Sequence, residues 1–336
     1  MPGFIRSASL TGFAAVARRH GIDPERALRE FALPRHCLDD PDVMVPIESV
    51  RRLLESAAER TGVDSFGLEM AEARRTGSLG PLGLLVREQP TLRQATEALA
   101  RYARSMNEAL FLTLEEAGDV VVLREELIIG GSGPVRQSTE LAIGVAFSML
   151  RAFLGPAWKP RRVCFAHHAP ADRSVHERFF GGKVEFGHDF NGVVCARGDL
   201  DAPNPDADPT MAQYARKLLE ETAATKTASL ADEVHRLVVM QLGGGRCTID
   251  RVAHSLGVDR RTVHRRLGGE GRTFSAIVDD VRRDFAERYL KDGGRTLAEV
   301  SALLGFAAPS AFSRWYRRQF GRTASQERGS ARRKAR

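Results

Sequence analysis

The stretch TLAEVSALLGFAAPSAFSRWYRRQFG, residues 296–321, decides the fold of the C-terminal part of the chain. Thr296 and Glu299 have the spacing of a capping box, in which each side chain accepts the backbone N–H of the other residue at a helix start. Gly305 ends that helix, because glycine adopts the left-handed conformation without steric cost. Pro309 suits the first turn of a second helix, where the N–H that it lacks would have no partner. The stretch predicts two short helices joined by a glycine turn.

The second of these helices is predicted to have two different faces. Phe312, Tyr316 and Phe320 recur every four residues and form an inner face. The outer face keeps the polar residues Ser313, Arg314, Arg317 and Arg318. Two short helices around a glycine turn, the second with a cationic outer face, indicate a helix-turn-helix. A solvated basic helix on a globular surface is the alternative that this stretch alone leaves open.

An internal repeat argues against that alternative. Four positions match with an offset of 48 residues: Ile249, Val252, Leu256 and Gly257 correspond to Leu297, Val300, Leu304 and Gly305. After the turn the offset becomes 49, and Val263, Arg265 and Leu267 correspond to Phe312, Arg314 and Tyr316. The sequence therefore predicts two helix-turn-helix units, of which the second has a turn one residue longer.

Three segments of this region resemble the AraC/XylS family of transcription regulators. They are LGVDRRTVHRRL (256–267), GRTFSAIVDDVRRDFAERYL (271–290) and LLGFAAPSAFSRWYRRQFG (303–321). The resemblance implies that the long middle helix holds the two units so that their second helices enter successive major grooves on one DNA face. It also implies RNA polymerase as a protein partner.

The candidate DNA-binding residues lie on the second helix of each unit, because that helix lies in the major groove with its N-terminal residues nearest the bases. The first unit offers Arg260, Arg261, Thr262, His264 and Arg265, and the second offers Ser310, Ser313, Arg314, Arg317 and Arg318. Arg265 and Arg314 occupy matched positions, and arginine can bond O6 and N7 of guanine together. Arg317 and Arg318 lie one turn further along, where we expect contacts with the DNA backbone.

Charge is distributed unevenly along the 336 residues. Residues 246–336 hold 21 Lys and Arg against 10 Asp and Glu, whereas residues 1–245 hold 29 against 33. This asymmetry indicates double-stranded DNA as the partner of the basic part. The four cysteines are scattered without a C-x-x-C pair, which favours neither a zinc site nor a redox motif. The longest apolar run, Leu141–Leu150, is too short to span a bilayer, so we expect a cytoplasmic protein.

The N-terminal part is predicted to be α+β, with helices against a small antiparallel sheet. Helices are expected at 7–20, 23–32, 46–60, 91–106 and 135–154, followed by a further helix at 211–222. Residues 111–115 and 120–125 alternate around EEAGD as a β-hairpin, and further strands are expected at 161–166, 183–186 and 193–196. The loop GGSGP, 130–134, lacks the lysine of a phosphate-binding loop.

The stretch HAPADRSVHERFFGGKVEF, 168–186, resembles the regulatory domain of one branch of the family, the branch named for an arabinose-binding-like domain. That name does not establish a sugar ligand. His167 and His168 are candidate ligand contacts, although a loop or core histidine is the simpler interpretation. The residues suggest no catalytic triad, no metal triad and no carboxylate pair on one helix face, so we expect neither catalysis nor a cofactor or metal.

The expected organisation is a ligand-sensing or dimerisation domain at 1–208, a connecting helix and linker at 209–227, an all-α domain with two helix-turn-helix units at 228–328, and a basic tail at 329–336. The predicted function is sequence-specific transcription regulation by a homodimer under control of a small-molecule effector. A non-specific architectural DNA-binding protein and an enzyme with an appended DNA-binding module remain as alternatives.

Overall fold

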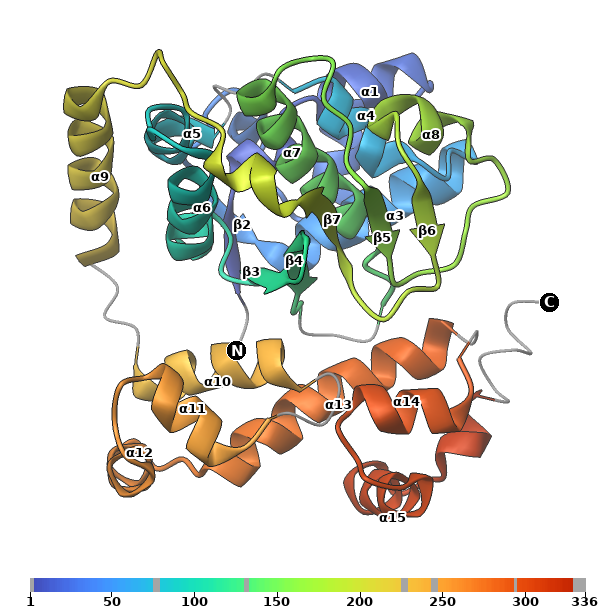
Figure 1. Ribbon diagram of the computed structural model, residues 1–336. Helices are drawn as coiled ribbons and strands as arrows, with labels where there is room; N and C mark the ends of the chain where they lie inside the picture. The colour runs from blue at the N-terminus through green and yellow to red at the C-terminus, as the bar shows by residue number, and fades with distance from the viewer. Residues whose placement is uncertain are drawn as a thin grey trace. The chain divides into compact units, whose positions relative to one another are not determined.

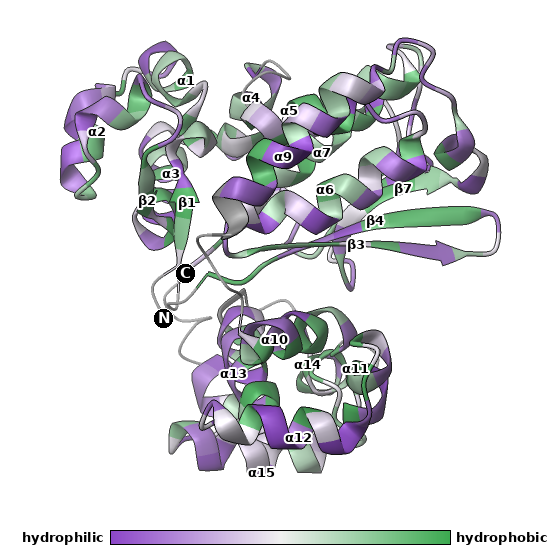
Figure 2. Cartoon of the chain, turned by 90° about the vertical axis from the view of Figure 1, so that its left-hand side faces the viewer, coloured by the Kyte–Doolittle hydropathy of each residue, from purple (hydrophilic) through white to green (hydrophobic). Residues whose placement is uncertain are grey.

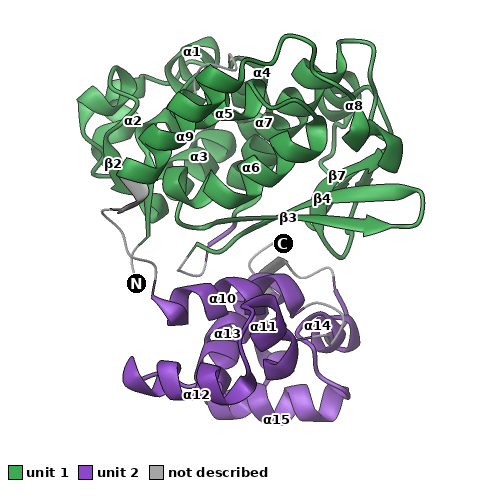
Figure 3. Ribbon diagram, turned by 60° about the vertical axis from the view of Figure 1, so that its left-hand side comes forward, with its two compact units in different colours: residues 1–130, 135–226 green, residues 131–134, 227–336 purple. Residues whose placement is uncertain are grey.

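The computed structural model describes residues 3–74, 79–129, 133–224, 229–242, 247–292 and 295–328. Contacts divide the chain into two units (Figure 3): residues 1–130 with 135–226, and residues 131–134 with 227–336. The basic tail expected at 329–336 lies outside the described residues, as do positions 225–227 of the expected linker.

The first unit contains a five-stranded sheet in the order β3-β4-β7-β5-β6 (Figure 1). Its strands are β3 (Leu110–Ala117), β4 (Val120–Leu127), β5 (Arg162–Phe165), β6 (Val184–Phe186) and β7 (Asn191–Ala196). The predicted hairpin is confirmed, but it is longer than expected: Ala117 pairs with Val120, so only Gly118 and Asp119 form the turn. Gly118 has a φ of 63°, as two-residue hairpin turns require.

The prediction of a wholly antiparallel sheet is wrong for one pair of strands. β5 and β6 run parallel, with Cys164 opposite Glu185. Parallel neighbours need a crossover connection, and the short helix α8 (Ser174–Phe180) supplies it between them. Its two phenylalanines, Phe179 and Phe180, are buried. The helix escapes sequence analysis because it has only seven residues within a polar stretch.

Helices α6 (Leu92–Met106) and α7 (Arg136–Leu154) pack on the sheet, mainly on β3 and on β7 and β4. Thr91 caps α6 by accepting the N–H of Gln94, as its sequence position predicts. The other elements of the unit surround this pair: β1 (Phe4–Arg6), η1 (Ser7–Leu10), α1 (Phe13–Arg19), α2 (Pro24–Glu30), η2 (Arg35–Leu38), β2 (Met44–Pro46), α3 (Ile47–Thr61), α4 (Phe66–Glu72), α5 (Gly80–Arg87) and η4 (Arg197–Asp201). The single helix expected at 7–20 is interrupted, because Gly12 adopts a φ of 86° between η1 and α1.

Two glycines set the close approach of α4 to α7. A side chain at Gly67 would meet the carbonyl oxygen of Gln137 at 2.0 Å, and one at Gly144 would meet the Cβ of Ala71 at 2.5 Å. Gln137 also accepts the N–H of Gly67 at 2.8 Å through its side-chain oxygen. Only glycine allows the two backbones to come this near, so α7 is fixed against α4 as well as against the sheet.

Helix α9 (Pro209–Ala224) corresponds to the helix expected at 211–222 and is longer at both ends. It packs on α5 and α6. Ala212, Ala215 and Leu219 face these helices and are buried. Tyr102 of α6 donates a hydrogen bond to Glu220 at 3.1 Å. Within its unit α9 is therefore a packed element.

The second unit is entirely helical in its described parts: α10 (Leu230–Gln241), α11 (Ile249–Ser255), α12 (Arg260–Gly269), α13 (Phe274–Asp292), α14 (Leu297–Leu303) and α15 (Pro309–Phe320). Thr248 caps α11 and Thr296 caps α14, and the predicted capping box of Thr296 with Glu299 is present. Gly257 and Gly305 have φ values of 65° and 70° at the ends of these two helices. The repeat in the sequence is therefore a repeat of helix pairs.

Helix α13 joins the two pairs and fixes the turn of the second. The guanidinium of Arg282 donates to the carbonyl oxygens of Leu304 at 3.0 Å and Gly305 at 3.3 Å, and it lies 4.1 Å from the ring centre of Phe306. On the same helix Asp279 accepts the indole N–H of Trp315 at 2.8 Å. These contacts satisfy carbonyl groups that the end of α14 would otherwise leave without partners.

We predict that Arg282→Ala lowers the free energy of unfolding of the second unit by about 2–3 kcal/mol, because two hydrogen bonds from a charged donor are lost together. Urea unfolding followed by fluorescence of Trp315, with Trp158 of the first unit replaced by phenylalanine, would measure it. Arg283→Ala is the control, because Arg283 is exposed and contacts only Asp280 and Gln319 in the described structure. Equal urea midpoints for the two variants would contradict the role given to Arg282.

Candidate nucleic-acid interface and ligand cavity

Helix α12 presents a row of polar side chains over a small apolar core. Val263 and Leu267 are fully buried, whereas Arg260, Arg261, His264 and Arg265 are exposed. Asp259 caps the helix by accepting the N–H of Thr262 at 2.7 Å and its hydroxyl at 3.0 Å. These hydrogen bonds from Thr262 lower the pKa of Asp259. Among the five candidate residues of this helix Thr262 is half-buried, and its hydroxyl group already donates a hydrogen bond to Asp259 at the start of the helix.

Helix α15 repeats this arrangement with larger aromatic residues. Phe312, Trp315 and Tyr316 are buried, while Ser310, Ser313, Arg314, Arg317 and Arg318 are exposed. Phe320, expected on the inner face, is half-buried and stacks on Tyr316 with ring centres 4.4 Å apart. The hydroxyl of Ser313 donates to the carbonyl oxygen of Pro309 at 2.9 Å, which favours a local role for that side chain.

The arginines of these two faces differ from other arginines of the unit. Within the part of the chain that the structure describes, Arg260, Arg261, Arg265, Arg314, Arg317 and Arg318 form no ion pair, whereas Arg272 pairs with Asp280 at 2.6 Å and Arg322 with Glu327 at 2.8 Å. Figures 1 and 3 show α12 and α15 along the same edge of the unit. The two helices therefore offer an exposed cationic surface, in which Asp259 is an acidic neighbour of Arg265 without forming an ion pair with it.

Sequence analysis missed three residues that position this surface. Asp259 fixes the start of α12, Arg282 fixes the turn before α15, and Trp315 anchors α15 to α13. Asp259 stood directly before the predicted helix, and an aspartate in that place is a capping signal. The roles of Arg282 and Trp315 depend on contacts between distant segments, which no local pattern reveals.

The first unit contains a partly open cavity of about 120 Å³. Its walls come from α3, α5, α6, α7, the β3–β4 hairpin and the N-terminal segment, and most lining side chains are aliphatic, including Leu54, Leu82, Leu99 and Leu141. An apolar space with a few polar groups is the usual character of a small-molecule site. The polar lining groups therefore decide what the cavity can hold.

Glu125 is the one lining residue whose side chain is acidic in the described part of the cavity wall. Glu125 lies on the same face of β4 as the buried residues Val121, Leu123 and Leu127, because side chains two positions apart in a strand point to the same side. Its carboxyl therefore faces the core. Figure 2 shows how hydrophobic β4 is over much of its length. Burial and the neighbouring Glu126 hold the pKa of Glu125 well above its ordinary value, which favours the neutral carboxyl. Its Oε1 has no hydrogen-bond partner within the described structure.

Two arginines reach the cavity from its N-terminal side. Arg6 pairs with Asp42 and donates to the sulfur of Met106 at 2.7 Å. Arg74 donates to the carbonyl oxygens of Ala8 and Thr11, and no ion pair of Arg74 occurs among the described residues. Burial lowers the pKa of Arg74 to about 10, so the guanidinium stays charged at neutral pH.

The two candidate histidines lie elsewhere. Neither His167 nor His168 is among the residues that line the cavity. His167 is half-buried, with its Nε2 3.4 Å from Glu140, and the fully buried His176 approaches the same carboxylate at 3.1 Å. Burial lowers the pKa of His167, with an opposing effect of Glu140. This pair of histidines surrounds a buried carboxylate at α7 and forms part of the core.

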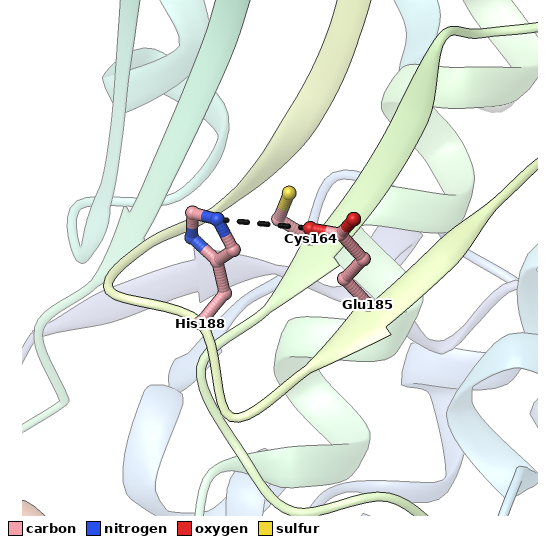
Figure 4. Close-up of side chains that lie close together, drawn as sticks. All are labelled: Cys164, Glu185 and His188. Atoms are coloured by element: carbon pink, nitrogen blue, oxygen red, sulfur yellow. Dashed lines mark ion pairs between the residues drawn. The ribbon is translucent and has the colours of Figure 1, made fainter.

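Cys164, Glu185 and His188 form a small cluster whose possible ligand atoms lie within 4.8 Å of one another (Figure 4). Glu185 is paired with Lys183 at 2.7 Å and with Arg162 at 3.7 Å. Burial and the carboxylate of Glu185 raise the pKa of Cys164 to about 11, which favours the thiol over the metal-binding thiolate. Because Glu185 is already paired and the thiol is protonated, we interpret this cluster as a polar contact between neighbouring strands.

Comparisons with known proteins agree with this geometry. Residues 21–204 match the model of the arabinose-binding N-terminal domain of AraC transcription regulators, and residues 252–330 match a helix-turn-helix domain. The HTH-type transcriptional regulator VirS of Mycobacterium tuberculosis is 31% identical over 326 residues, which cover 96% of each chain. The ornithine utilization regulator of Pseudomonas aeruginosa is 26% identical over 313 residues, covering 92% of this chain and 91% of the relative.

A solved structure, that of the transcriptional regulator CdpR from Pseudomonas aeruginosa, has a TM-score of 0.45 at 21% identity and covers 94% of this chain and 98% of its own. Within the described residues, no helix combines the length and apolar character needed to cross a membrane. By its two matched domains and its full-length relatives, the chain belongs to the AraC family of transcription regulators, with an N-terminal effector-binding domain and a C-terminal helix-turn-helix DNA-binding domain.

Proposed function

We propose that the chain binds a specific DNA site through two helix-turn-helix units, α11–α12 and α14–α15. The observation that carries this proposal is the set of seven exposed arginines on α12 and α15, the six named above and Arg266, that form no ion pair within the described structure. Cationic groups left unpaired beside one another attract the phosphate backbone, which supplies much of the affinity of DNA-binding proteins. The matched turns and caps of the two pairs support a common role.

The two units contribute differently to sequence preference. α12 begins with two arginines and carries His264 and Arg265 one turn further, whereas α15 begins Pro309-Ser310-Ala311, with little hydrogen-bonding capacity. We therefore assign most base reading to α12, with Arg265 as the principal reader and Arg314 as a second. Arg317 and Arg318 are assigned to the phosphates. Surfaces this different on the two helices favour a specific regulator over a non-specific architectural protein.

The cavity of the first unit is the proposed effector site. It is the apolar space of the regulatory domain into which the unpaired carboxyl oxygen of Glu125 opens. We further propose that the protein acts by binding alone and is not an enzyme, since the relatives are named regulators. Family resemblance supports RNA polymerase as a partner and the cytoplasm as the location.

A homodimer is proposed through α9. Five large hydrophobic residues are exposed in the described chain, and three of them lie on this helix: Met211, Tyr214 and Leu218. Their spacing of three and four residues places them on one face. A contiguous apolar stripe on a helix of a packed unit is typical of a contact surface, and a second copy of the chain offers the same stripe in return.

We predict that Arg265→Ala costs about 1–3 kcal/mol of binding free energy on the preferred site and relaxes preference at one base position. Arg317→Ala should weaken matched and scrambled sites about equally and reduce the salt slope by about one. Binding curves on both DNAs at several salt concentrations measure these effects. Arg272→Ala is the control, because Arg272 is paired with Asp280 away from both faces.

If Arg265→Ala lowered both affinities equally and kept the discrimination between the two DNAs, α12 would not be the base-reading helix. A loss of preference in Arg317→Ala as large as in Arg265→Ala would equally contradict the division between base readers and phosphate contacts.

We predict that Tyr214→Glu shifts the full chain from dimer to monomer by at least tenfold in dissociation constant, because a charge would be buried in the contact. Sedimentation velocity across a range of protein concentrations measures the shift. Gln213→Glu adds the same charge to another exposed side of α9 and should leave the dimer intact. An unchanged dimer in Tyr214→Glu would exclude α9 as the interface.

A further inference from the structure

The ionisable groups of the cavity are of two kinds, and they do not neutralise each other. No ion pair joins Glu125 to Arg6 or Arg74 in the described structure, and neither arginine lowers the pKa of Glu125. Arg6 has two acidic neighbours, Asp42, with which it pairs, and Asp40, which raises the pKa of Arg6 against the effect of burial. Burial alone shifts the pKa of Arg74, so among the described residues the uncompensated positive charge on this side is that of Arg74.

Arg74 carries that uncompensated charge. Its described hydrogen bonds go to two backbone carbonyl groups, those of Ala8 and Thr11, which leave the guanidinium fully positive. The hydroxyl of Ser9, next to Ala8, also lines the cavity and has no hydrogen-bond partner within the described residues. A guanidinium beside a free hydroxyl is suited to a carboxylate, which accepts hydrogen bonds from both.

Glu125 gives the β4 side of the cavity the opposite character. Its carboxyl is 2% exposed, its Oε1 has no partner, and the aliphatic residues around it disfavour the ionised form. A protonated carboxyl is a hydrogen-bond donor. This side of the cavity is therefore suited to a neutral acceptor, such as a hydroxyl or carbonyl oxygen, and not to a second negative charge.

The size and walls of the cavity limit the rest of the ligand. A core cavity of roughly 150 Å³ holds benzene in another protein, so a space of about 120 Å³ accommodates a body of about six carbon atoms. Most of the lining is aliphatic, with Leu54, Leu82, Leu99 and Leu141 among its members, so the body of such a molecule should be largely apolar.

We infer that the effector is a small monocarboxylic acid with an apolar body, whose carboxylate binds Arg74 and Ser9 and whose far end offers a hydrogen-bond acceptor to Glu125. This inference rests on the proposal that the cavity is the effector site. It assigns recognition of the ligand's negative charge to Arg74 and selection of its far end to Glu125.

Calorimetric titration of the full chain with four probes tests the ligand class: hexanoate, 6-hydroxyhexanoate, methyl hexanoate and hexylamine. Hexanoate should bind at least tenfold more tightly than its methyl ester and than hexylamine, and 6-hydroxyhexanoate should bind more tightly still. If hexylamine bound better than hexanoate, or if no probe bound at about 10 mM, the inference would be wrong.

Three variants test the two residues. Arg74→Gln keeps a donor for the backbone carbonyls without the charge, and it should reduce hexanoate affinity at least tenfold while leaving methyl hexanoate unchanged. Arg74→Lys keeps the charge and should retain the preference for hexanoate over the ester, which separates loss of charge from loss of fold. Glu125→Gln keeps a neutral donor and should retain binding of 6-hydroxyhexanoate; a loss of that binding would mean that an ionised Glu125 accepts a hydrogen bond from the hydroxyl of the probe, against the inference.

Operator binding measured on the same preparations separates this inference from the proposed function. A chain that binds DNA specifically but none of the probes would overturn the ligand class and leave the regulator intact. Probes that bind with the expected selectivity but never change affinity for DNA would support the ligand class and contradict the cavity as effector site.

Discussion

The guanidinium of Arg282 is the contact on which the second unit depends most. From the middle of α13 it reaches the last carbonyl groups of α14 and the ring of Phe306, while Asp279 of the same helix holds Trp315. Burial lowers the pKa of Arg282, with an opposing effect of Asp279. One helix thus fixes the turn and the body of the second helix pair, and the main contacts that hold α15 in position lie on its inner side.

In this arrangement, the side chains on the outer sides of α12 and α15 are not needed to hold the two helices in place. Their small inner faces are filled by Val263 and Leu267 in one case and by Phe312 and Tyr316 in the other. The exposed arginines therefore need no acidic partner for folding, and their charge is available to a polyanion. In the first unit Glu125 likewise has a polar atom that the fold does not use. It stands at an inward position of β4, and within the described structure its Oε1 has no hydrogen-bond partner.

Local patterns predicted most of the helices and the hairpin, because the residues that determine these elements lie close together in the sequence. The capping box of Thr296, the glycine turns and the alternation around Gly118 all act within a few residues. The parallel pairing of β5 with β6 was not predictable in this way, because it depends on the short crossover helix α8. Glu125 stands at an inward position of an alternating segment, so the sequence pattern is enough to predict that its side chain faces the core. Arg74 was not recognisable, because its lack of an acidic partner exists only in the folded chain.

The central claim is that α12 and α15 together read one DNA site. Methylation interference on a site selected by the full chain from a random DNA pool tests it most directly, since N7 of guanine lies in the major groove. The account predicts that methylated guanines interfere in two successive major grooves on one face of the duplex, about 10 base pairs apart. Interference confined to a single groove, or absent from both, would contradict it.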